Sequence, residues 1–444
     1  MTQAPHQSMP KQCQGWGDLK AAYRLLSNPD VDPHDIQQPH RRLTLQACDE
    51  HEIVLCIQDT TELDLSRKNK MRGRGSLGNG NTQGLLQHSA LAFLPTDDQH
   101  QLDQPGGQLL GVLHQCWHRR TEAPAGETLR QLQSRRTDAD VWLETASAIK
   151  SLGTSSARLI HVGDRNCDLF RFFDHCRQLN HGLVVRAMHN RLLPSSHLDD
   201  SSSMRLWSMM EAEPIVGHCC LTIHEQRTQK GRVRCKKRSA KLAIRYRTVT
   251  LPPPQNDPRT REVQPLKLQA VYVVEQETPN ETEAVSWMLL TSEVVNNLDD
   301  ALRIIGYYRH RWVIEEWHRV LKEGCRIEAT HLDDARDVQR LAAIKGVIAL
   351  RMLQLRDLAD QAGDDPQALQ RTMPTMWIAV VAALSKQSPR ELTPRQFYLK
   401  IAKQGGYIGR SRDPRPGWKV LWQGWYDIHH MVCGAELWEQ NKCG

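Results

Sequence analysis

The sequence lacks any hydrophobic run long enough to cross a membrane. Its longest apolar run, from Trp377 to Leu384, is far shorter than the roughly 20 residues that a transmembrane helix needs. The first residues, MTQAPHQSMPKQ, contain neither the charged segment nor the apolar segment of a signal peptide. These absences argue against a membrane role, and we expect a cytoplasmic protein.

The sequence also lacks the paired cysteines of a zinc site. Its 12 cysteines are scattered without a CxxC pair, as the reduced thiols of a cytosolic protein would be. The 58 Lys and Arg residues outnumber the 51 Asp and Glu residues only slightly, so the net charge is +7 and the position of the basic residues matters more than their number. A chain of 444 residues has room for two or three structural units.

Hydrophobic patterns in the first half predict an α/β arrangement. Short helices are expected from residues 17 to 45. Three strand-like runs follow, EIVLCIQDTT, LQHSALAFLP and GVLHQCWH, and suggest an antiparallel meander. Residues 141–187 then alternate between helix and strand, which favours an α/β core.

The second half changes character twice. Residues 190–284 contain short strand-like pieces and a Pro-rich loop, which suggest an inserted β subdomain, and VSWMLLTS then resumes a core-like strand. Long helical patterns follow over residues 299–324 and 335–361, and the remainder to Gly444 is mostly helical. Within the insertion, Arg227 to Arg247 carries many Lys and Arg residues and no acid, which predicts a hairpin that follows DNA phosphates or, alternatively, a solvated edge protected by charge.

Two aspartates occupy equivalent places in the predicted core. Asp59 and Asp164 each lie at the carboxyl end of a predicted strand, the edge at which open α/β sheets place their ligands. The alternative for either residue alone is a turn former or a helix cap.

A third carboxylate is predicted on the helix YYRHRWVIEEWHRVLKEG. At about 100° per residue, one face collects Tyr308, Arg311, Glu315 and Lys322 within roughly 60° of arc. The opposite side is apolar. Glu316 lies about 100° away from Glu315, so Glu315 is the expected ligand. The alternative is a surface helix with ordinary charge pairs.

Together these motifs resemble the insertion-sequence-four family of bacterial DDE transposases. The resemblance is carried by QDTT around Asp59, by GDRNCDLF around Asp164, and by the spacing Y-x2-R-x3-E-x6-K. It continues through LLTSE and the C-terminal PGWKVLWQGW, and so covers most of the chain.

The resemblance implies an α/β fold with an RNase H-like catalytic core, a mixed sheet flanked by helices. The core is expected in residues 51–189 and 285–362, interrupted by the inserted β subdomain of residues 190–284. Residues 1–50 are expected to be a helical DNA-binding remnant, and residues 363–444 a helical dimerisation region.

The implied function is cut-and-paste transposition: nicking of the 3′ strand, hairpin formation and resolution, and strand transfer. Two Mg²⁺ or Mn²⁺ ions would be held by Asp59, Asp164 and Glu315, with Asp59 bridging them. The implied partners are double-stranded DNA, as terminal inverted repeats and target, and a second copy of the chain in a homodimer. The bound protein would then be associated with the nucleoid.

The resemblance also implies a set of DNA contacts. Trp287 would stack on a base flipped out of the hairpin, unless it is an ordinary core residue. The full set of expected DNA-contacting residues is Tyr308, Arg311, Lys322, Arg319, His318, Trp287 and Arg186.

Two features leave alternatives open. The helical spacing of Trp418, Leu421, Trp425, Ile428 and Val432 predicts packing against a partner helix, or docking onto the chain's own core. The segment before GDLKAAYRLL is shorter than the DNA-binding arm of the family, so the alternative function is an N-terminally truncated, non-catalytic inhibitor, or a defective remnant, that binds full-length transposase.

Overall fold

The structure of the chain is a computed structural model. It describes residues 6–13, 15–67, 70–78, 81–96, 106–120, 124–126, 128, 131, 135–194, 203–223, 226–227, 233–235, 237–255, 257–260, 262–278, 284–410, 413 and 415–442. None of the helices in these ranges is long and apolar enough to cross a membrane.

The centre of the fold is a mixed sheet built from the first half of the chain. Strands β1 (Ile53–Asp64), β3 (Gln83–Pro95) and β4 (Gly107–His118) pair antiparallel, as the meander prediction required. Strands β5 (Arg158–Gly163) and β6 (Gly182–Arg186) then run parallel to β1. The resulting order β4-β3-β1-β5-β6 agrees with the mixed sheet expected for an RNase H-like core.

The predicted insertion is not a separate sheet but extends this one. Strand β14 (Ser286–Thr291) pairs antiparallel with β6. It is followed in space by β13 (Leu266–Glu275), β12 (Arg238–Leu251) and β9 (Gly217–Ile223). Residues 190–284, which the sequence predicts as an inserted β subdomain, thus contribute strands that continue the sheet beyond β14. The described residues also form short strand pairings: β2 (Gly75–Ser76) with β3, β7 (Leu192–Pro194) with β8 (Ser203–Arg205), and β10 (Gln226–Arg227) with β11 (Val233–Cys235).

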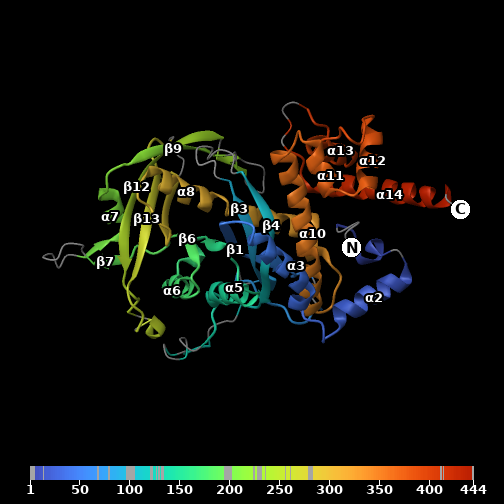
Figure 1. Cartoon of the computed structure of the whole chain (residues 1–444). Helices are drawn as coiled ribbons and strands as arrows, with labels where there is room; N and C mark the ends of the chain where they lie inside the picture. The colour runs from blue at the N-terminus through green and yellow to red at the C-terminus, as the bar shows by residue number, and fades with distance from the viewer. Residues whose placement is uncertain are drawn as a thin grey trace.

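Helices cover both faces of the sheet (Figure 1). One face packs against α5 (Asp140–Ser151), α6 (Phe170–Gln178) and α7 (Leu206–Ala212). The other packs against α8 (Leu298–Arg309), α9 (Trp312–Arg319) and α10 (Ala335–Gln361), and this larger core continues into the C-terminal helices. Those are α11 (Pro366–Thr372), α12 (Thr375–Ser385), α13 (Pro394–Gln404) and α14 (Trp418–Lys442).

The long helix predicted over residues 299–324 is interrupted twice. Helix α8 ends at Arg309, a turn at His310 and Arg311 follows, and α9 then continues to Arg319. Val320–Gly324 forms a π-helical turn, the kind of irregularity that often occurs at functional sites. The placement of Tyr308, Arg311, Glu315 and Lys322 on one helix face assumed a single straight helix. It therefore does not hold across these breaks. The predicted apolar face is nevertheless buried, at Ile314, Trp317, Val320 and Leu321.

The apolar stripe of α14 docks onto the chain's own core. Trp418, Leu421, Ile428 and Val432 are all buried and belong to the same core as α10 and α13, and Trp425 packs against it. Trp425 also stacks on Trp377 of α12, with ring centroids 4.1 Å apart. Packing of this stripe against a partner chain, which the sequence favoured, is thus the wrong alternative. The end of α14 extends beyond the body of the molecule (Figure 1).

The N-terminal helices are α1 (Met9–Gln12), α2 (Trp16–Ser27) and α3 (Pro33–Cys48). As the sequence predicted, α2 stops before Asn28-Pro29 and α3 begins at Pro33, where the Asp32 carboxylate accepts a hydrogen bond from the His34 amide. Arg340 of α10 ties these helices to the core. Its buried guanidinium donates to the carbonyls of Leu26 at 2.9 Å and Val31 at 2.6 Å.

Replacing Arg340 by Met should weaken this attachment. Two carbonyls would lose charged donors, and bonds of this kind contribute about 1.5–3 kcal/mol each. We expect Arg340→Met to lower the free energy of unfolding by about 3 kcal/mol and to expose the segment around Asn28 to limited proteolysis. Arg336→Met, on the exposed side of the same helix, is the control. Equal unfolding midpoints for the two variants would contradict the assignment.

Candidate active site

Asp59 and Asp164 lie side by side on the face of the sheet that α9 covers. The parallel register pairs Ile57 with Val162, and its continuation by two residues brings Asp59 level with Asp164. Side chains alternate along a strand, so Asp59 points to the same face as Leu55 and Ile57, which belong to the core shared with α9. One detail of the prediction is wrong: β1 does not end at Asp59 but continues to Asp64, paired with β3.

A glycine and a cap shape the turn at Asp164. A Cβ added to Gly163 would lie 2.7 Å from the Cys167 sulfur, so the strand can approach the turn this closely only with glycine. The Asp164 carboxylate accepts hydrogen bonds from the Asn166 amide at 2.9 Å and from the Asn166 side chain at 3.1 Å. Asp164 therefore caps this turn, which is the alternative role that the sequence left open for it. It also lies beside Asp59.

Arg311 joins the third carboxylate to the first. Its guanidinium lies 2.6 Å from a Glu315 oxygen and 3.5 Å from an Asp59 oxygen, and its plane lies over the Trp312 ring. Glu316 is turned elsewhere and pairs with Arg319 at 3.0 Å and Arg356 at 3.4 Å. The structure thus directs Glu315, and not Glu316, toward the aspartates.

The carboxylates repel one another in a partly dehydrated place. The pKa of Asp59 is raised to about 7, mainly by burial and then by the charge of Asp164, against the opposing effects of Arg311 and of the Thr60 amide. Glu315 acts in the same direction as Asp164. Concentrated negative charge of this kind, with a single guanidinium to balance it, is what a divalent cation would stabilise.

The residues fit such a cation by donor type and by charge, since carboxylate oxygens are the ligands that Mg²⁺ prefers. In the present arrangement of the described residues, no three acidic, His or Cys side chains are close enough to hold a metal ion together. Arg311 accounts for this, because it lies between Asp59 and Glu315. Binding through all three carboxylates requires Glu315 to turn away from Arg311.

Tyr308 and Trp287 form one wall beside this site. The Tyr308 ring is buried and meets the Trp287 ring edge to face at 5.4 Å, and Trp287 packs against the main core. The same face of β14 carries Leu289, which pairs with Arg186 of β6. Arg186 is half-buried and donates a hydrogen bond to the Ser286 carbonyl at 2.8 Å.

The remaining predicted DNA contacts differ in exposure. Lys322 is partly exposed and lies 3.7 Å from Glu328, near the end of β1, and about half of the Arg319 side chain is exposed. His318 is buried, and burial together with the charge of Lys322 lowers its pKa to about 3. The expectation that His318 contacts DNA is not supported by this position, since its ring faces the core.

A buried polar chain beneath Asp59 is not evident from the sequence. Gln58 hydrogen bonds to His161 at 2.5 Å and to His88 at 3.1 Å, and His88 hydrogen bonds to the Thr60 hydroxyl at 2.7 Å. His161 continues the chain to His181 at 2.9 Å. All of these side chains are on the opposite side of the sheet from Asp59.

This chain fixes the backbone that carries the carboxylate. Burial lowers the pKa of His88 and His161 well below the ordinary value, so both rings are neutral and each serves as donor and acceptor. The Thr60 amide in turn donates to the Asp59 carboxylate at 2.7 Å. The available sequence signal was the pair of polar residues, Gln58 and Thr60, at strand positions that face a core.

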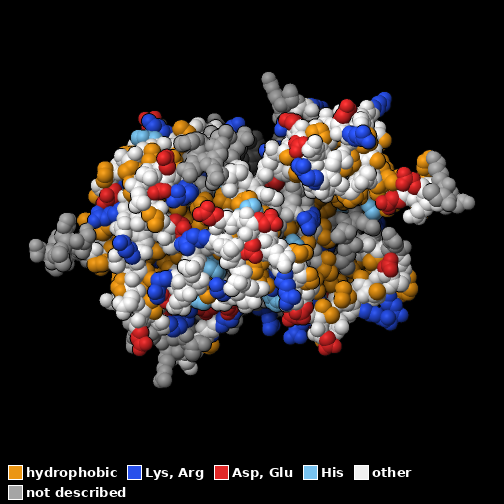
Figure 2. Space-filling model, viewed as in Figure 1, with side chains coloured by type: hydrophobic (Ala, Val, Ile, Leu, Met, Phe, Trp, Pro, Cys, Tyr) orange, Lys and Arg blue, Asp and Glu red, His pale blue; other side chains and the backbone are white. Residues whose placement is uncertain are grey.

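The basic stretch from Arg227 to Arg247 is only partly available for DNA. Residues 228–232 and 236 lie outside the described residues. In β12, Arg238 pairs with Glu275 at 2.8 Å and Arg247 pairs with Glu213, whereas Lys237 and Lys241 are exposed. On the face shown in Figure 2, positive and negative side chains are interspersed.

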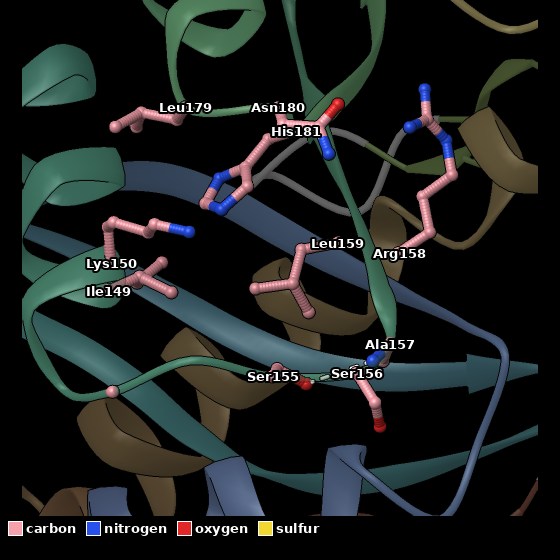
Figure 3. A pocket seen from close by; sticks show the side chains of 11 residues that line it. Ile149, Lys150, Ser155, Ser156, Ala157, Arg158, Leu159, Leu179, Asn180 and His181 are labelled. Carbon is pink, nitrogen blue, oxygen red and sulfur yellow. Dashed lines mark hydrogen bonds between the residues drawn. The ribbon is translucent and has the colours of Figure 1, made fainter.

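A cavity of about 190 Å³ lies at the opposite end of β5 from Asp164. His181 and Lys150 point toward one another across it, while Arg158 points away and pairs with Glu293 at 2.7 Å (Figure 3). It contains none of the three carboxylates.

Two segments of the chain match transposase family models. Residues 1–31 match the family model described as transposase DNA-binding, and residues 212–352 match the model described as transposase DDE domain. Glu315 lies within the second match, and Asp59 and Asp164 precede it. The two matches support a DDE transposase, a DNA-binding enzyme of a class that generally depends on divalent metal ions, with the RNase H-like fold that the sheet order suggests.

The raised pKa of Asp59 predicts a stability that depends on pH. Because the folded state holds this proton up to about pH 7 and the unfolded state releases it near pH 4, ionisation destabilises the fold as pH rises between these values. Asp59→Asn should therefore unfold less readily than the wild type at pH 8, by on the order of 2–4 kcal/mol, with the difference vanishing near pH 4. Added Mg²⁺ at pH 8 should stabilise the wild type only. Denaturant unfolding measures both effects, and a pH-independent difference would refute the explanation.

Proposed function

We propose that this chain is a cut-and-paste DNA transposase of the insertion-sequence-four family, close to the transposon-five transposase. The observation that carries the proposal is the position of Asp59, which lies beside Asp164 and is joined to Glu315 through Arg311. The proposed reactions are nicking of the 3′ strand at the element end, hairpin formation, hairpin opening and strand transfer.

Asp59, Asp164 and Glu315 would hold two Mg²⁺ or Mn²⁺ ions. When bound, such ions lower the pKa of a nucleophilic water or hydroxyl and neutralise charge that develops on the phosphorus oxygens. The chain's own task is to hold the carboxylates in place. The β1–β5 register fixes the first two, and the polar chain through Gln58 and Thr60 holds the strand that carries Asp59.

Arg311 is the proposed contact for the DNA phosphate at the site. It neutralises Asp59 and Glu315 in the structure described above. The planar fork of its guanidinium suits two phosphate oxygens, which would replace the two carboxylates as its partners. Lys322 and Arg319, both at least partly exposed on the segment that follows Glu315, would contact neighbouring phosphates.

Trp287 is the proposed stacking platform for a base displaced during hairpin formation. Its ring is partly buried and meets the ring of Tyr308, whose charge acts on Arg311. Stacking on an aromatic ring contributes about 1–3 kcal/mol per base, and every base offers a face for it. Arg186, near Trp287 through the Ser286 carbonyl, would contact the adjoining backbone.

The active species is proposed to be a homodimer on DNA. Because the apolar stripe of α14 is used within the chain, the surface left for a second copy is the other side of that helix. Met431 and Leu437 are exposed there, at 40% and 61%. This part of α14 extends away from the body of the molecule (Figure 1).

Removing one carboxylate should abolish cleavage without abolishing DNA binding. We expect Asp59→Asn, Asp164→Asn and Glu315→Gln each to reduce nicking of a duplex that carries the flanking inverted repeat by more than about 1000-fold in Mg²⁺. Nicks and hairpins on a denaturing gel report the chemistry, and a mobility-shift assay reports binding.

Glu316→Gln is the matched control for this experiment. It removes a carboxylate from the same helix, one residue away, that pairs with Arg319 and Arg356 instead of Arg311. Its cleavage rate should stay within a few-fold of the wild type. Undiminished cleavage by Glu315→Gln, or equal losses in the two variants, would show that Glu315 is not the ligand.

A further inference from the structure

A second cavity, of about 130 Å³, lies between the N-terminal segment and the polypeptide that follows the π-helical turn. Its lining includes His6, Gln12, Tyr23, Arg326, Thr330 and Lys345. The first three belong to the segment that matches transposase DNA-binding, and the last three to the segment that matches the DDE domain. The cavity thus lies where these two parts of the chain meet.

Lys345 is a buried cation without a counter-ion. It is 3% exposed, and its ammonium donates one hydrogen bond, to the Cys325 carbonyl at 2.6 Å. Within the part of the chain that the structure describes, it forms no ion pair with Asp or Glu. An ammonium has three N–H donors, and a buried charge is costly unless it is paired. Burial lowers the pKa of Lys345 to about 8, which still leaves the side chain mostly charged at pH 7.

Arg326 adds a second positive charge to the same cavity. Its charge lowers the pKa of both Lys345 and His6, which places it near them, and it too has no ion pair among the described residues. Its backbone is left-handed, with φ of 49°, a conformation that costs a residue with a side chain roughly 1 kcal/mol. Strain of this kind is concentrated at functional sites.

The other groups supply hydrogen bonds and little charge. The Thr330 hydroxyl is buried and has no hydrogen-bond partner in the structure. Burial and Arg326 lower the pKa of His6, so its ring is neutral, and Asp427 of α14 acts on it in the opposite direction. Asp427 does not line the cavity and accepts a hydrogen bond from Gln423 at 2.9 Å.

We propose that this cavity binds one phosphate group through Lys345, Arg326 and Thr330. Two cations and an unused hydroxyl match an oxyanion, and the volume is about ten times the least that one water molecule needs. A DNA phosphate and free phosphate offer the same chemistry. We assign the phosphate to DNA because one wall belongs to the segment that matches transposase DNA-binding, and this assignment rests on the proposed function.

The first experiment uses inorganic phosphate and the full chain. Compared with chloride at equal ionic strength, phosphate should raise the thermal unfolding midpoint of the wild type by about 1–3 °C. Lys345→Met should abolish this shift, and Thr330→Val should weaken phosphate binding about tenfold. The matched control is Lys400→Met, because the Lys400 ammonium also donates to a carbonyl, of Leu384 at 2.7 Å, but lies in α13 away from the cavity.

The second experiment separates DNA from free phosphate. If a DNA phosphate occupies the cavity, Lys345→Met should reduce the salt dependence of duplex binding by about 0.9 in the slope of log K against log salt, and Lys400→Met should not. A Lys345-dependent response to phosphate with an unchanged slope would keep the site and reject DNA as its ligand. Should Lys345→Met not fold, Arg326→Gln removes the other cation of the cavity and gives both readouts.

Two results would overturn the proposal. One is an equal phosphate shift in the wild type and in Lys345→Met or Thr330→Val. The other is no phosphate shift in the wild type together with an unchanged slope in Lys345→Met and in Arg326→Gln. Neither readout requires strand cleavage, so a chain that binds phosphate here but does not cut DNA would refute the proposed transposase activity and not this site.

Discussion

The parallel pairing of β1 with β5 is the constraint on which the candidate active site depends. Each strand carries its aspartate two residues beyond the last described pair, and the alternation of side chains sends both to the face that α9 covers. A shift of the register by one residue would turn one aspartate to the other face. The buried hydrogen bonds of Gln58 and His161, which link the same two strands, oppose such a shift.

The negative charges at the candidate active site exceed the positive charge that lies beside them. Arg311 pairs with Asp59 and Glu315, and the pKa of Asp59 is raised to about 7 because neither water nor Arg311 compensates for its burial beside Asp164. A fold with this arrangement gives up stability at neutral pH. Such a loss is expected where a site is prepared for a cation that the folded chain alone does not supply.

Much of this architecture could be predicted from the sequence, since local signals determine it. The bounds of α10, the break at Asn28-Pro29 and the strands that precede Asp59 and Asp164 follow from apolar spacing, capping residues and proline. Glu315 as the ligand stays a prediction, although the structure pairs Glu315 with Arg311 beside Asp59 and pairs Glu316 with Arg319 and Arg356. The choice of Glu315 over Glu316 depended only on the different directions of two adjacent side chains within α9. The breaks before and after α9 do not change these directions.

What could not be predicted depends on partners distant in the sequence. The stripe that begins at Trp418 is equally apolar whether it meets a second chain or the chain's own α12 and α13. Periodicity gives the face of a helix and not the identity of what covers it. Likewise, no local pattern shows that β14 continues the sheet at β6, or that His318 turns toward the core while Arg319 beside it remains exposed.

Helix α10 connects the N-terminal segment to the catalytic part by two buried cations with different surroundings. Arg340 has its charge met by the carbonyls of Leu26 and Val31 and by Asp337 at 3.2 Å, so it is a structural tie. Lys345, little more than one turn further along, meets a single carbonyl and a cavity. The structural role of Arg340 is enough to explain why it is buried. The second cation remains costly to the isolated chain, and an anion shared by the two parts would both offset that cost and couple DNA binding by the N-terminal segment to the helix that packs behind the active site.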